Sequence, residues 1–352
     1  MPDRGECGRS ARWADRADRA ACAVTDVPVR QPWWSGTRRV AVPAGSRYPP
    51  GRVGRRVGRT VSLGYRAPVS PSSPRARRDE LVNRAELPDL TSLPGVQAGV
   101  EAARTAVTAL RGHPALRRGR EQVAAAAAVR AARASAALDG APLALDRGDV
   151  GADAVAGPRP ADPGPADPGP ADPGPADPGP ADPRLAGALR VAASLVELKP
   201  VWQRAPLQAM ARLHVLAAAD LAAADLLGRP RADPGIGPRL AALAEVVAAA
   251  PWPAPVMVAV VHGELLVLRP FGSADGVVAR AAARLAMMTS GLDPDGLGVP
   301  EVAYLRSGPR YREAAQEFTS AGQRGLTAWV LLVCDALVDG AREGGSIADA
   351  SG

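Results

Sequence analysis

Apolar residues recur at the three-to-four-residue spacing of α-helices along most of the chain after residue 79. The interval after Gly228 contains no two-residue alternation long enough to form a β-hairpin. The pattern therefore predicts an all-α protein. Helices are expected over 96–111, 120–138, 184–198, 207–227, 239–250, 256–268, 277–288, 311–318 and 326–340.

Two segments lack this helical pattern. Residues 1–78 are rich in Arg, Pro, Gly and Ser and have few aliphatic runs, a composition typical of a disordered tail. Within 157–183 the sequence PADP occurs five times with Gly between the copies, which favours an extended, polyproline-like spacer in a surface loop. An SH3-type ligand is the alternative, but the repeat has no basic flank.

These boundaries divide the chain into five predicted regions. A disordered basic tail (1–78) precedes an N-terminal helical region (79–156). A Pro-rich repeat linker (157–183) then leads to a helical core (184–345). A flexible tail is expected over 346–352.

The formal net charge of +7 is concentrated at the start of the chain. Residues 1–78 carry 17 Arg against 5 acidic residues, a net charge of +12, so the remainder carries −5. The Arg residues of this tail are compatible with a nucleic-acid-binding arm. A solvated tail, or upstream sequence translated from a wrongly assigned start codon, explains the composition equally well. No folded nucleic-acid-binding motif accompanies the tail, so nucleic acid is not an expected partner.

Cysteine usage and hydropathy bear on the cellular compartment. Cys7, Cys22 and Cys334 have neither disulfide-framework nor CxxC spacing, which favours a reducing cytoplasm. No run approaches eighteen apolar residues, and the N-terminus lacks a signal-peptide core. We therefore expect a cytoplasmic protein with no membrane partner.

The turn between the helices expected over 256–268 and 277–288 is the candidate functional site. Pro270 ends the first helix, because proline lacks an amide donor and restricts the residue before it. The turn leaves unpaired N–H groups at a helix start, where the helix dipole also favours negative charge, so an anion site is predicted. Arg280 and Arg284, one turn apart on one helix face, are expected beside it. The candidate loop residues are Gly272, Ser273, Ala274, Asp275 and Gly276.

The segment Arg269–Arg280 resembles the signature of the Fic (Fido-fold) family, HPFxxGNGRxxR. The matching residues are Pro270, Phe271, Gly276 and Arg280. The resemblance implies a Fic-type helical bundle, in which this loop holds a nucleotide's phosphates. It also implies a protein target, because the family's His accepts the proton of a target hydroxyl while AMP is transferred.

This chain departs from the signature at four positions. Arg269 stands at the catalytic His, Ser273 at the acidic metal ligand, Asp275 at the Asn and Val277 at the first Arg. Since Arg is not deprotonated in proteins, it cannot act as a general base, and no catalytic residue is assigned. Ser273 offers a neutral oxygen where Mg²⁺ prefers a carboxylate, so no metal is assigned. The loop N–H groups and the remaining Arg residues still favour ATP, another nucleotide or another anion.

A second motif precedes the repeat. Ser135, Asp139 and Gly140 resemble the [S/T]xxxE[G/N] pattern of the inhibitory helix found in many Fic proteins, with Asp in place of Glu. In that family the acid pairs with the second Arg of the signature, here Arg280, and blocks the γ-phosphate position. The alternative is a solvated acid near a helix C-terminus, where the dipole disfavours negative charge.

The histidines offer no metal site, because none has a ligand at metal-binding spacing. His214, in a segment that resembles the family's "LH" helix, and His262 are expected to be hydrogen-bonded core residues. His113 is expected to be exposed in a turn.

The sequence thus predicts an all-α Fic-type protein that has lost AMP transfer and binds a nucleotide or another anion. One alternative is an active enzyme with atypical chemistry, which transfers a nucleotidyl or phosphoryl group to a protein hydroxyl. The other is a structural or interaction module whose site is empty.

Overall fold

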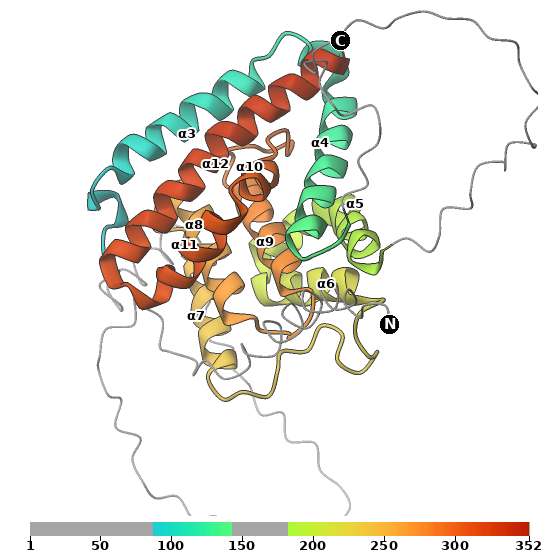
Figure 1. Ribbon diagram of the computed structural model, residues 1–352, viewed down its shortest axis with the longest axis vertical. Coiled ribbons are helices and arrows are strands. Elements are labelled where there is room, and N and C mark those ends of the chain that lie inside the picture. Colours follow the sequence, from blue (N-terminus) through green and yellow to red (C-terminus); the bar gives the residue numbers. More distant parts are fainter. Residues whose placement is uncertain (1–86, 143–181, 352) are drawn as a thin grey trace, which may run out of the picture.

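The computed structural model describes residues 87–142 and 182–351, and every regular element in these two ranges is a helix. The all-α class is therefore confirmed for the described residues (Figure 1). The elements are η1 (Leu90–Ser92), α3 (Val96–Arg111), α4 (Leu116–Leu138), α5 (Pro183–Arg204), α6 (Pro206–Ala218), α7 (Ile236–Ala249), α8 (Ala254–Leu268), α9 (Asp275–Thr289), α10 (Pro300–Arg306), α11 (Gly308–Ser320) and α12 (Gly322–Ser351).

Helices α8 and α9 lie at the centre of the bundle. Almost every side chain of both helices is buried, as expected for helices that are covered on all sides. The long helix α12 packs along α3 on one side of this pair, while α5 and α6 cover another side (Figure 1). Helix α4 contacts α5, α9, α10 and α12, so its C-terminal end reaches the start of α9.

The helices before and after the repeat share one hydrophobic core. Buried residues from α3 and α4, such as Val100 and Val123, belong to the same cluster as Val260 of α8 and Trp329 of α12. The predicted regions 79–156 and 184–345 therefore do not form separate cores where the structure describes them. The predicted tail (1–78) lies outside the described residues.

The repeat also lies outside the described residues, except for its last two positions. Asp182 caps α5 by accepting a hydrogen bond from the amide of Arg184 (2.8 Å), and Pro183 is the first residue of the helix.

Several helix ends differ from the predictions. Helix α5 continues through Pro200 to Arg204, because its last turn buries Trp202. Helix α6 ends at Ala218, and the rest of the segment predicted as helix forms turns. The predicted flexible tail is wrong for residues 346–351, which are the last turns of α12 with Ala348 fully buried. Within the described ranges, no helix is both long and apolar enough to cross a membrane.

Candidate anion-binding site

A tight loop, residues 269–274, joins α8 to α9. Arg269, Gly272 and Ala274 all have left-handed backbone conformations, with φ of 45°, 80° and 49°. This conformation is strained for residues other than glycine, and it reverses the chain within six residues. As a result α9 begins directly at the loop, with Asp275 and Val277 buried and Gly276 partly buried.

The carboxylate of Asp275, the first residue of α9, folds back onto the loop. It accepts hydrogen bonds from the amides of Phe271 (2.9 Å) and Gly272 (2.8 Å). Burial raises the pKa of Asp275 to about 6, although these two hydrogen bonds and the nearby charge of Arg269 oppose the rise. Gly272, one of the predicted loop donors, is therefore already occupied, and Asp275 holds the loop rather than a ligand.

The remaining amides at the start of α9 stay available. The N–H groups of Ser273, Ala274, Asp275 and Gly276 have no hydrogen-bond partner among the described residues. These four donors are what remains of the predicted anion site.

Asp139, the residue directly after α4, supplies a carboxylate to this site. One oxygen of Asp139 accepts from the amide of Val277 (3.0 Å), and the other accepts from Nη2 of Arg280 (2.6 Å). The carboxylate also lies so close to Gly276 that a Cβ atom there would overlap it. The chain thus places its own anion on the N-terminus of α9.

Arg280 is held on several sides. Its Nε donates to the Ser135 hydroxyl (2.7 Å), its Nη2 donates to the Ser135 carbonyl (2.9 Å), and its Nη1 lies 3.5 Å from the hydroxyl of Tyr311. Burial alone would lower the pKa of Arg280, yet the charge of Asp139 and the contact with Tyr311 keep it above its usual value. The structure therefore brings Ser135 and Asp139 together with Arg280, while Gly140 continues the chain at a φ of 92°.

Arg284 does not join this group. Its Nε and Nη2 form a two-point ion pair with the carboxylate of Glu301, at 3.1 and 2.9 Å, and its other donors reach the carbonyls of Gly296 and Gly298. Each of its three guanidinium nitrogens is engaged in the interior, so Arg284 is removed from the predicted anion site. Its role is to tie α9 to α10 and to the loop before it.

His214 and His262 are both buried and hydrogen-bonded. His214 stacks on Phe271 with ring centres 4.3 Å apart, and its Nε2 lies 3.0 Å from the Ser273 hydroxyl. His262 contacts Tyr311 through Nε2 (2.8 Å), and burial keeps its pKa well below the usual value. His113 is only partly buried and lies 3.2 Å from Asp349.

The segment after α6 lies against the outer edge of the loop. The amide of Arg231 donates to the carbonyl of Pro270 (2.8 Å), and its Nε donates to the carbonyl of Arg269 (3.0 Å). The Arg269 side chain is exposed beside it. The contacts of Arg231, Tyr311 and Glu301 could not be predicted from the sequence, because each depends on the packing of distant segments.

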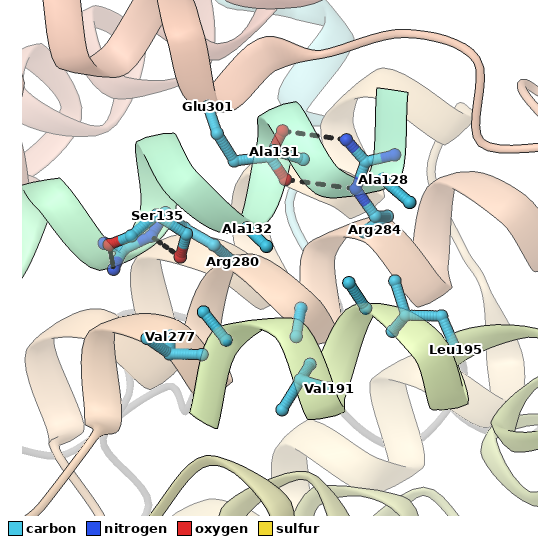
Figure 2. A pocket seen from close by; sticks show the side chains of 13 residues that line it. Ala128, Ala131, Ala132, Ser135, Val191, Leu195, Val277, Arg280, Arg284 and Glu301 are labelled. Atoms are coloured by element: carbon cyan, nitrogen blue, oxygen red, sulfur yellow. Dashed lines mark hydrogen bonds and ion pairs between the residues drawn. The ribbon is translucent and has the colours of Figure 1, made fainter. Parts of the chain in front are cut away.

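A small cavity lies between α4, α5 and α9, lined mostly by alanine, valine and leucine (Figure 2). Figure 2 shows Arg280 joined to Ser135 and Arg284 joined to Glu301 beside it. The volume of the cavity, about 30 Å³, is enough for a few water molecules but not for a nucleotide.

The residues present do not fit a magnesium ion. Ser273 offers a neutral hydroxyl, while the oxygens of Asp275 and Asp139 already accept N–H hydrogen bonds. Three carboxylate, His or Cys ligands do not come together anywhere in the described ranges. Since the Arg side chain is not deprotonated in proteins, Arg269 offers no general base at the end of α8.

Comparison with known proteins assigns no family: no family model and no curated protein matches the chain. The fold and the site define an all-α protein in which the chain's own Asp139 carboxylate occupies the N-terminus of a central helix.

Proposed function

We propose that this chain is a Fic-type protein without AMP-transferase activity, which binds the phosphate group of a nucleotide or another oxyanion at the start of α9. Asp139 competes with the ligand for Arg280. The observation that carries this proposal is the Asp139 carboxylate itself, which accepts hydrogen bonds from Val277 N–H and from Arg280. A site that binds a carboxylate from within the chain has the charge and donors to bind an external anion.

The surroundings of the carboxylate support this proposal. Arg280 remains anchored by Ser135 when Asp139 leaves, because its Nε and one Nη2 contact do not involve Asp139. The cation is therefore already positioned for a ligand, which reduces the ordering cost of binding. Asp139 is more accessible than its partner, with 23% of its side chain exposed against 2% for Arg280. Displacement of Asp139 thus requires less rearrangement than displacement of Arg280.

Anion binding is tested by thermal unfolding of the full chain with ADP, ATP or GTP. We expect weak stabilisation of the wild-type chain and stronger stabilisation of Asp139→Ala, in which the competitor is gone. A ligand at one hundred times its Kd stabilises by about 2.7 kcal/mol. Asp339→Ala is the matched control, since it removes an exposed acid that pairs with Arg342. If no nucleotide stabilises Asp139→Ala, the proposal fails and an interaction module with an empty site is left.

Loss of AMP transfer is tested separately. The chain is incubated with α-labelled ATP, Mg²⁺ or Mn²⁺ and a cell lysate, and we expect no labelled protein, because Arg269 cannot accept a proton. Label that appears with the wild-type chain and disappears with Arg280→Ala would instead establish the atypical transferase.

A further inference from the structure

The hydrogen bonds of His214 fix its tautomer. The amide of Gly228 donates to Nδ1 of His214 at 2.9 Å, and a backbone N–H can only donate. Nδ1 is therefore unprotonated, and in the neutral ring the proton lies on Nε2. Burial lowers the pKa of His214, so the neutral ring is the relevant form at neutral pH.

The tautomer determines the role of Ser273. Nε2–H of His214 donates to the Ser273 oxygen across 3.0 Å, so this hydroxyl oxygen is an acceptor in the pair. Its own hydrogen points elsewhere, and Ser273 donates no side-chain hydrogen bond to another described residue. Ser273 thus keeps a free O–H donor in the loop that leads into the unpaired amides of Ala274 and Gly276.

We propose that the site binds its oxyanion without a metal ion, and that His214 is the positioning residue that makes Ser273 a hydrogen-bond donor to it. This inference rests on the proposed function, because it names the form of the ligand at the same site. The ligand class is a metal-free phosphate, diphosphate or sulfate group, which has only acceptors to offer to these donors.

The same residues oppose a Mg²⁺-bound ligand. Mg²⁺ requires lone pairs, preferably from carboxylates. One lone pair of Ser273 is used by His214, and Asp275 uses both of its oxygens to hold the loop amides. The exposed cations Arg231 and Arg269 lie close enough to lower the pKa of Asp275 and add further positive charge. Donors and cations therefore dominate the loop, which favours the free anion.

The test measures binding of inorganic pyrophosphate to full-chain Asp139→Ala by calorimetry, once with EDTA and once with excess Mg²⁺. We expect tight binding with EDTA and weaker binding with Mg²⁺, because the ion sequesters the free anion. In the Asp139→Ala background, Ser273→Ala should weaken binding roughly tenfold, in line with one hydrogen bond to a charged group. Ser290→Ala, at the far end of α9, should leave it unchanged.

The role of His214 is tested by a double-mutant cycle. His214→Phe keeps an aromatic ring for Phe271 but removes the Nε2 donor, and it should weaken pyrophosphate binding only while Ser273 is present. NMR of the wild-type chain supplies a second measurement, which should show His214 protonated on Nε2. Protonation on Nδ1, or an equal effect of His214→Phe with and without Ser273, would overturn the assignment.

The outcomes also separate the two proposals. If pyrophosphate binds Asp139→Ala only with Mg²⁺, the metal-free assignment is wrong while the anion site stands. If Ser273→Ala binds as tightly as its parent, the donor role of Ser273 is wrong while the anion site stands. If pyrophosphate binds neither with EDTA nor with Mg²⁺, the proposed function itself is wrong.

Discussion

A single methyl group at position 276 provides a direct test of the Asp139 contact. The Cβ of Gly276→Ala would overlap both carboxylate oxygens of Asp139, and Asp139 would have to leave the start of α9. The hydrogen bonds to Val277 N–H and Arg280 would be lost with it. In an Asp139→Ala background the same methyl group meets none of these atoms.

The size of the effect follows from these contacts. A hydrogen bond to a charged group contributes about 1.5–3 kcal/mol, so the loss of two gives roughly 3 kcal/mol after allowance for the partial exposure of Asp139. Ala is favoured over Gly in a helix by up to about 1 kcal/mol. Gly276→Ala should therefore destabilise the wild-type chain by about 2 kcal/mol and stabilise Asp139→Ala by up to about 1 kcal/mol. The expected coupling energy is about 3 kcal/mol.

Urea denaturation of the four proteins in this cycle, followed by circular dichroism, measures the coupling. The decisive result is the sign, because the methyl group should destabilise one background and stabilise the other. If Gly276→Ala destabilises both backgrounds equally, Asp139 is not seated on α9 in solution, and the argument for a self-occupied anion site fails.

Three further predictions concern other buried charges. Below pH 6.5 the unfolded chain takes up a proton at His262, while the buried ring of the folded protein does not. The free energy of unfolding should therefore fall by up to about 1.4 kcal/mol per pH unit on acidification. Urea titrations should show that His262→Gln removes this slope. Arg284→Leu should lower the free energy of unfolding by about 3–5 kcal/mol, because it leaves the buried Glu301 carboxylate unpaired. The double variant with Glu301→Leu should recover most of that loss in thermal unfolding, and no recovery would show that the unpaired carboxylate is not its cause. Sulfate binding to Asp139→Ala should strengthen as the pH falls through about 6, where Asp275 becomes neutral, and a flat profile matching that of Asp275→Asn would refute this.

The helical class and the turn at the centre of the bundle could be predicted from the sequence. Helix α3 has its predicted bounds, and α8 ends at its predicted last residue, two positions before Pro270, because spacing and proline act locally. The extension of α5 through Pro200 could not be predicted, since it depends on the burial of Trp202 by other helices. The helical course of the last residues depends in the same way on the burial of Ala348.

The candidate site shows the same division. The resemblance to the Fic patterns predicts the pair of Asp139 and Arg280, although they are 141 positions apart and their contact exists only in the fold. Nothing local distinguishes Arg280 from Arg284, which are one turn apart on α9. Their different roles come from what each meets, Ser135 and Asp139 in one case and Glu301 in the other.

The firm hold on Arg280 has a kinetic consequence for the proposed binding. Because Ser135 keeps the guanidinium in place, a ligand has to wait for the Asp139 carboxylate to swing away. The observed association rate should then level off at high ligand concentration, at the rate at which the carboxylate departs. Removal of that carboxylate should turn the plateau into a straight line.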